Sequence, residues 1–169
     1  MKTLYVLRHA KSSWDDAELA DFDRPLNERG ESTAPFMGEL MAANGFEPEV
    51  IVSSPAVRAR ETARLAKEAA HLPTKIVYDE RIYEASSRTL KLVASEIDDR
   101  FESAMLVGHN PGMEGLVRLL TGRSEEMPTA ALAVIDLDIE QWSDIDGGLG
   151  ALRRLIRPKE AMKAFKKEN

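Results

Sequence analysis

The sequence predicts an α/β fold, a three-layer α/β/α sandwich in which helices cover both faces of a mainly parallel central sheet. Two short apolar runs, residues 50–53 and 104–107, show no alternation of apolar and polar residues, which is typical of parallel strands covered on both faces. A helix-starting pair that ends in proline follows the first run directly, at residues 54–55, and the second run after two further residues, at 110–111. Strands that alternate with helices along the chain indicate this fold class.

The first predicted strand spans residues 4–7 and ends abruptly in Arg8 and His9. In open α/β sheets, ligands bind beyond the carboxyl ends of the strands, so this pair stands at the usual binding site. Arginine offers a fixed fork of donors to phosphate oxygens, and a neutral imidazole nitrogen can accept a phosphoryl group. The pair therefore indicates a phosphate clamp beside a nucleophile.

Residues 11–22 have no sustained hydrophobic period, and we expect a loop there. Asn27 is a good N-cap for the helix that follows, and the Asn-Gly pair at residues 44–45 ends that helix. Pro35 lies inside it. Because proline removes a backbone donor and clashes with the preceding turn, we expect either a kink at Pro35 or a helix that begins again there.

A helix with a stripe of alanines follows strand 50–53, and Arg58 lies in its first turn. The amino terminus of this helix favours an anion, and the Arg58 side chain can reach over the strand end. Strand 104–107 likewise runs into Gly108 and His109 beside another helix start. Glycine allows close backbone approach at this third strand end.

We expect a short strand over residues 75–78, followed by a polar loop over residues 79–86. The loop contains Glu84 and leads into a helix capped by Ser86 or Ser87. A glutamate near a helix start beside the binding edge can protonate a leaving group.

In the C-terminal part we expect two strands, over residues 131–138 and 151–157, joined by a glycine-rich turn. The last residues are basic and carry Met162 and Phe165 on one helical face. We expect a fraying, solvated terminus, with a docking segment as the alternative. The chain is therefore expected to form one domain over residues 1–158, followed by a basic tail over residues 159–169.

Composition excludes several kinds of site. The chain has no cysteine, which excludes disulfides and thiol catalysis and suits the reducing cytoplasm. A net charge of −6 disfavours binding to nucleic acid. His9, His71 and His109 lack the spacing of a metal site, and no apolar run approaches membrane-spanning length. We expect a cytoplasmic protein that binds no metal, cofactor, nucleic acid or membrane.

Three ordered motifs stand at the ends of the predicted strands: Leu-Arg-His-Ala at 7–10, Ser-Ser-Pro-x-x-Arg-Ala at 53–59 and Gly-His-Asn-Pro at 108–111. With these motifs the chain resembles the histidine phosphatase superfamily, which is also called phosphoglycerate-mutase-like. The short length, Arg-Pro-Leu at 24–26 and Pro-Thr-Ala-Ala-Leu-Ala at 128–133 are similar to the compact SixA-type phosphohistidine phosphatases. The resemblance spans about residues 2–157.

The resemblance implies that His9 is the nucleophile and forms a phosphohistidine intermediate. It also implies that Arg8, Arg58 and His109 bind the phosphoryl oxygens and stabilise charge during transfer.

Three further positions match the family pattern. Arg24 matches an arginine of the phosphate pocket in the compact branch, and Ser12 matches a small hydroxyl residue after the nucleophile. Glu84 matches the general acid of the mutase-like members. One departure is Ala10, which stands where the family usually has a glycine after the nucleophile.

The activity that the resemblance implies is that of a metal-independent phosphatase without a cofactor, with phosphohistidine on a protein partner as the preferred substrate. A phosphohistidine needs little help from a general acid, because a protonated imidazole is a good leaving group. The segment between Arg58 and Glu84 is too short for a large lid, which favours hydrolysis at an open site. A phosphatase of small phosphate esters, a phosphopeptide-binding module without turnover and a phosphoglycerate-type mutase remain as alternatives.

Overall fold

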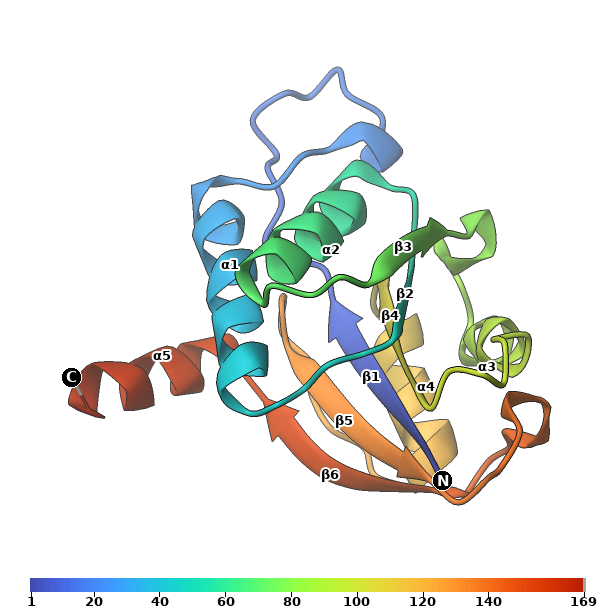
Figure 1. The fold of residues 1–169 in the computed structure, drawn as a ribbon. Helices are drawn as coiled ribbons and strands as arrows, with labels where there is room; N and C mark the ends of the chain where they lie inside the picture. The colour runs from blue at the N-terminus through green and yellow to red at the C-terminus, as the bar shows by residue number, and fades with distance from the viewer. Residues whose placement is uncertain (169) are drawn as a thin grey trace.

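A six-stranded mixed sheet forms the middle of the computed structural model, which describes residues 1–168 (Figure 1). The strands are β1 (Lys2–Arg8), β2 (Val50–Ser53), β3 (Lys75–Tyr78), β4 (Ser103–Gly108), β5 (Leu132–Leu137) and β6 (Gly150–Ile156). Their order in the sheet is β3-β2-β4-β1-β5-β6. The pairs β3–β2, β2–β4 and β4–β1 are parallel, whereas β5 is antiparallel to β1 and β6. The predicted mainly parallel sheet is confirmed.

Helices cover both faces of this sheet. The helices are α1 (Glu28–Ala43), α2 (Val57–Ala69), α3 (Ser87–Ser95), α4 (Gly112–Thr121) and α5 (Pro158–Glu168), and the short 3-10 turns are η1 (Asp21–Asp23), η2 (Glu80–Ile82) and η3 (Trp142–Asp144). Helices α1 and α2 lie on one face, and α3 and α4 lie on the other (Figure 1). The three-layer α/β/α sandwich predicted from the sequence is therefore confirmed.

Alternate residues of β1 supply the two cores. Leu4 and Val6 belong to the cluster that packs under α3 and α4, whereas Tyr5 and Leu7 belong to the cluster under α1 and α2. All four side chains are buried. Because both faces of the strand are covered, neither face requires polar residues, which explains the missing alternation.

Helix α1 is continuous across Pro35. Its predicted cap is present, because the Asn27 side-chain oxygen accepts the Gly30 N–H at 2.9 Å. The alternative in which the helix begins again at Pro35 is wrong. Tertiary packing outweighs the local cost of the proline, since the buried side of α1 includes Met37 and Met41.

Helices α2 and α4 begin after their prolines rather than at them. The first helical residues are Val57 and Gly112, so Pro55 and Pro111 precede the helices instead of occupying the first position. The residue before a proline is pushed out of the helical region, which leaves a short irregular link between strand and helix. That link carries Ser54 to the site described below.

The basic C-terminal residues do not fray within the described range. Residues 158–168 form α5, and Phe165 lies edge-on to Phe36 of α1 with ring centroids 6.0 Å apart. Ala161 packs against the core cluster under α1 and α2. The prediction of a fraying, solvated terminus is wrong here, because one face of α5 is anchored. Asn169 lies outside the described residues.

No helix within residues 1–168 combines the length and the apolar character needed to cross a membrane.

Candidate active site

The sheet register places three strand ends at one level. Arg8 at the end of β1 is level with Gly108 of β4, and Ser53 of β2 is level with Val107 of β4. One further bond continues the ladder, because the His9 N–H donates to the Gly108 carbonyl at 2.9 Å. The residues that follow these strands therefore meet beyond one edge of the sheet, where open α/β folds bind ligands.

His9 and His109 are both buried, with ring centroids 5.1 Å apart. Nδ1 of His9 lies 2.7 Å from the Ala10 carbonyl oxygen. Because a carbonyl only accepts, Nδ1 carries the hydrogen, and Nε2 of the neutral ring keeps its lone pair. Burial lowers the pKa of His9 to about 3, and His109, Arg58 and Arg8 act in the same direction. His9 is therefore neutral at neutral pH, with Nε2 available as a nucleophile.

His109 is held by Ser54, the residue that links β2 to α2. Ser54 Oγ lies 2.8 Å from His109 Nε2 and accepts the Ala56 N–H at 3.2 Å. This arrangement favours donation from the hydroxyl to Nε2, which leaves the hydrogen of the neutral ring on Nδ1. Burial lowers the pKa of His109 to about 4. Nδ1 is buried and has no hydrogen-bond partner among the described residues, so it offers an unused donor.

Arg8 supplies a second unused donor. Its Nη1 donates to the Met127 carbonyl at 3.0 Å, whereas its buried Nε has no partner within residues 1–168. Burial lowers the pKa of Arg8, but a guanidinium keeps its charge in proteins. Leaving a buried donor unpaired costs about 1–3 kcal/mol. An anion that accepts from both unused donors would remove this cost.

Asp21 joins the other two arginines. Arg58 donates to the Asp21 carbonyl oxygen at 2.6 Å and to Oδ2 at 3.0 Å, while Arg24 donates to Oδ1 at 2.8 Å. The Tyr83 hydroxyl donates to Oδ2 at 2.6 Å. The hydrogen bond from Tyr83 contributes most to lowering the pKa of Asp21, and the two arginines add to it. Burial and the Asp21 carboxylate raise the pKa of Tyr83 to about 12.

Arg24 and Ser12 are also brought together. Both are buried, and Arg24 Nη2 donates to Ser12 Oγ. The Arg24 guanidinium stacks on the exposed ring of Trp14, 3.2 Å from its centroid. Arg24 is joined to Arg58 through Asp21, because both arginines donate to the same carboxylate.

Glu84 makes none of the hydrogen bonds that join this group, although its charge helps to raise the pKa of Tyr83. It is exposed, its φ of 55° falls in the left-handed region, and it makes no hydrogen bond or ion pair within residues 1–168. Its neighbour Tyr83 does face the site, with its ring edge-on to His109 and centroids 5.5 Å apart.

Sequence reasoning missed four polar residues that position the site: Asp21, Ser54, Thr62 and Tyr83. Thr62 Oγ1 accepts the Ala10 N–H at 2.9 Å and so holds the backbone beside His9. Ser54 was expected to cap a helix, and Asp21 lies in a loop without a pattern. Tyr83 stands next to Glu84, which offered the only signal for it.

The arrangement combines one free imidazole lone pair with three arginines and two unused buried donors. Such a set stabilises an oxyanion with several oxygens, because preorganised donors act strongly where water is excluded. Among the described residues there is no group of three or more His, Cys, Asp or Glu side chains that could hold a metal ion.

Comparisons with known proteins bear on this site. The chain matches the model of the histidine phosphatase superfamily (branch 1) over residues 4–110. An uncharacterised protein of Mycobacterium tuberculosis is 32% identical over 157 residues, which cover 86% of this chain and 96% of that protein.

Two solved structures are similar to this chain over almost its whole length. The crystal structure of a SixA-type protein from Agrobacterium tumefaciens has a TM-score of 0.79 and 34% identity, and the match covers 93% of this chain and 98% of that one. The protein histidine phosphatase SixA, solved in complex with tungstate, has a TM-score of 0.76 at 21% identity, covering 94% and 99%, and shows the shared fold. The chain therefore belongs to the histidine phosphatase superfamily, and within it is a phosphatase of the compact SixA type.

Proposed function

We propose that this phosphatase hydrolyses phosphohistidine on a protein partner, without a metal ion, through a phosphoryl intermediate on His9. The observation that carries the proposal is the hydrogen bond from His9 Nδ1 to the Ala10 carbonyl. It leaves Nε2 unprotonated in a pocket where burial holds the ring neutral. A neutral imidazole nitrogen facing an anion-binding pocket is the group that this chemistry needs.

The reaction has two half-reactions. First, His9 Nε2 attacks phosphorus, a P–N bond to His9 forms, and the P–N bond to the substrate imidazole breaks while that imidazole leaves with a proton. Then water attacks the same phosphorus, the P–N bond to His9 breaks, and inorganic phosphate leaves. Splitting one difficult step into two is the advantage of a covalent intermediate.

Arg8, Arg58 and His109 are proposed to hold the phosphoryl oxygens. The unused donors at Arg8 Nε and His109 Nδ1 support this role. Arg58 now donates to Asp21, so a bound phosphoryl group would compete with that carboxylate for the guanidinium. Arg24 and Ser12 are proposed to bind the phosphate or the substrate, since Arg24 donates both to Ser12 and to Asp21, the carboxylate that also binds Arg58.

Glu84 is proposed to act only when the leaving group is poor. A phosphate ester must expel an alkoxide, which requires a proton, whereas a phosphohistidine expels an imidazole that solvent can protonate. The exposed position of Glu84 favours the phosphoramidate substrate over small phosphate esters. Hydrolysis of small esters remains the second candidate activity. We also propose a cytoplasmic location, which the absence of cysteine favours.

The proposal is tested with a synthetic phosphohistidine peptide and with free phosphohistidine, both in excess EDTA. We expect release of inorganic phosphate from both, and none with His9→Ala. Phosphoserine and a coupled phosphoglycerate isomerisation assay are run beside them. Exclusive turnover of phosphoserine would favour the ester phosphatase, and isomerisation would favour a mutase. Tight peptide binding without turnover, equal in wild type and His9→Ala, would favour a binding module.

A further inference from the structure

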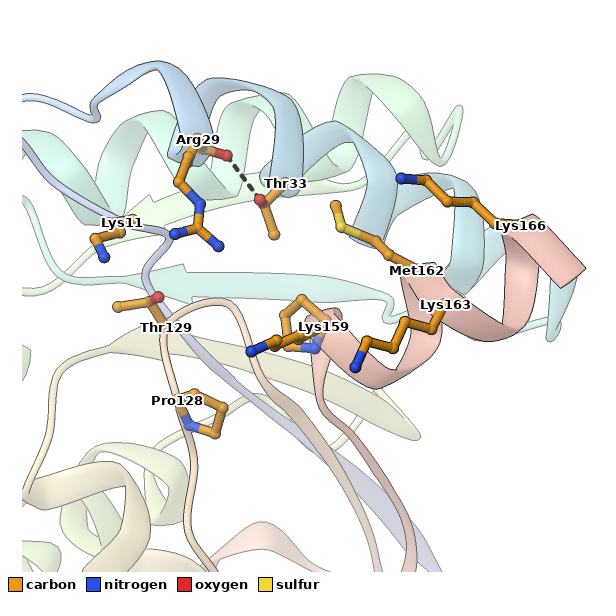
Figure 2. Close-up of a pocket in the computed structure, with 10 residues that line it drawn as sticks. Lys11, Arg29, Thr33, Pro128, Thr129, Lys159, Met162, Lys163 and Lys166 are labelled. Atoms are coloured by element: carbon orange, nitrogen blue, oxygen red, sulfur yellow. Dashed lines mark hydrogen bonds between the residues drawn. The ribbon is translucent and has the colours of Figure 1, made fainter.

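A basic groove lies between α1 and α5, next to the loop that follows the nucleophile (Figure 2). Its volume is about 390 Å³. Among the described residues that line it there is no acidic side chain, and its five cations are Lys11, Arg29, Lys159, Lys163 and Lys166. We call this feature the basic groove.

The cations of the basic groove are unpaired. None of the five side chains makes an ion pair or a side-chain hydrogen bond to another side chain within residues 1–168. By contrast, other arginines of the chain, such as Arg81 and Arg153, are paired with carboxylates. A cluster of five unpaired positive charges is unusual on a chain whose net charge is −6. Like charges repel one another, so this cluster is expected to favour an anionic ligand.

Three of the five cations form a row along α5. Lys159, Lys163 and Lys166 lie three and four residues apart on α5 and therefore share one face of the helix. Seven residues of helix span about 10 Å. In Figure 2, Arg29 from α1 and Lys159 from α5 extend into the groove from opposite walls, and Lys11 lies beside Arg29.

Packing fixes the two helices and the loop that carry these cations. The Phe36–Phe165 contact anchors α5 on α1. At the other end, a Cβ at Gly30 would overlap the Lys11 carbonyl, so only glycine lets the first turn of α1 approach this loop. The charges are thus presented by two helices and a fixed loop, not by a free tail.

The basic groove borders two segments that flank His9. Lys11 is two residues after His9, which limits the separation of their Cα atoms to about 7 Å. On the opposite side, Thr129 lines the groove and precedes Ala130, whose N–H donates to the His9 carbonyl at 2.9 Å. A ligand bound in the basic groove therefore lies against segments that are next to His9 in the fold.

We propose that the basic groove docks an acidic segment of the phosphoprotein substrate, next to its phosphohistidine. This inference rests on the proposed function and names the partner by its charge. A row of cations about 10 Å long matches several carboxylates spaced along a peptide, whereas a single phosphate group would occupy only one end. Complementary charges of this kind raise the rate of encounter and select the partner more than they add to catalysis.

The test uses two synthetic phosphohistidine peptides of equal length that differ only in flanking residues, four glutamates in one and four glutamines in the other. We expect wild-type protein to show a KM about ten-fold lower for the glutamate peptide at low salt, with equal kcat, since exposed ion pairs each contribute modestly. The preference should decline as salt is raised, because surface charges are screened. In K159Q/K163Q/K166Q most of the preference should be lost, while turnover of free phosphohistidine stays unchanged.

A matched control removes three positive charges elsewhere. Lys67, Lys75 and Arg118 do not line the basic groove and make no ion pair within the described residues, so K67Q/K75Q/R118Q should keep the preference for the glutamate peptide. Equal KM values for the two peptides in wild type, or the same loss in both triple variants, would overturn the proposal.

A binding measurement separates this proposal from the proposed function. The unphosphorylated glutamate peptide is titrated into wild type and both triple variants, with pyrophosphate and a short RNA as competing anions. Weakened peptide binding in the K159Q/K163Q/K166Q protein alone supports docking even where no peptide is hydrolysed. Saturable binding of pyrophosphate or RNA at these lysines, with no binding of the glutamate peptide, would show a site for another anion and would also overturn it. Absence of turnover of free phosphohistidine would reject the proposed function only.

Discussion

The Ser54 hydroxyl lies 2.8 Å from Nε2 of His109 and links the end of β2 to the second histidine of the site. Because Ser54 also accepts the Ala56 N–H, its own hydrogen is directed to the ring. The proton of neutral His109 is then left on Nδ1, the atom that has no partner within residues 1–168. A buried serine therefore decides which nitrogen of His109 can donate to a ligand.

Replacing this serine tests that relationship. Ser54→Ala should lower kcat/KM for phosphohistidine by about ten-fold, the equivalent of one hydrogen bond, and should shift the His109 tautomer toward Nε2–H in ¹⁵N NMR spectra. Ser53→Ala is the matched control, since Ser53 is also buried but bonds only to the Ser54 carbonyl. An unchanged tautomer in Ser54→Ala would contradict the assignment.

Asp21→Asn should tighten the binding of inorganic phosphate. The Asp21 carboxylate now accepts from Arg24 and Arg58, and its negative charge opposes an incoming anion. We expect phosphate to bind about three-fold to ten-fold more tightly by calorimetry, a range set by the partial exposure of Asp21. Asp16→Asn, a change in the same loop, serves as the control. Weaker phosphate binding in Asp21→Asn would instead mean that the carboxylate orders the arginines for the ligand.

Stability should fall as the solution is acidified below neutrality. The pKa values of His9 and His109 are lowered to about 3 and about 4, so between about pH 6.5 and pH 4 the unfolded chain binds protons that the folded chain does not. The free energy of unfolding should then decrease by about 1.4 kcal/mol per pH unit for each histidine. Denaturant unfolding of the His9→Asn/His109→Asn protein should show a shallower slope in this window. Parallel slopes for the two proteins would mean that the histidines are not held neutral by burial.

Loss of the Glu84 carboxylate should affect turnover of phosphate esters more than turnover of phosphohistidine. Glu84→Gln is expected to change turnover of a phosphohistidine peptide by less than about two-fold, while lowering any turnover of phosphoserine by about ten-fold or more, as loss of a general acid does. Steady-state kinetics with both substrates measure this difference. A large loss with the phosphohistidine peptide would place Glu84 in the phosphoramidate reaction.

The meeting of Arg8, His9 and His109 could be predicted because it depends on a general rule. Parallel strands end at one edge of a sheet, and each of these residues lies within two residues of the end of an apolar run. The same rule places Arg58, since α2 starts just beyond β2. The rule does not predict which side chains bond to one another within the site, because these contacts depend on the paths of the loops.

Asp21 illustrates that limit. Its carboxylate reaches Arg24, Arg58 and Tyr83 only because the loop folds over the strand ends, and a polar loop carries no period from which its path can be inferred. The anchoring of α5 could not be predicted for a related reason. Its charges favoured a solvated tail over a docking segment, whereas its anchor is a contact between Phe36 and Phe165, residues far apart in the sequence. Long-range contacts of this kind override local composition.

The central claim is that Nε2 of His9 carries the phosphoryl group during turnover. The direct measurement is a rapid quench of the protein with a phosphohistidine peptide, followed by mass spectrometry of the fragment that contains His9 and ³¹P NMR to identify the nitrogen. The account predicts one acid-labile, base-stable phosphoryl group on His9 Nε2, absent from His9→Ala. Turnover with the phosphoryl group on another residue, or at the same rate in His9→Ala, would contradict it.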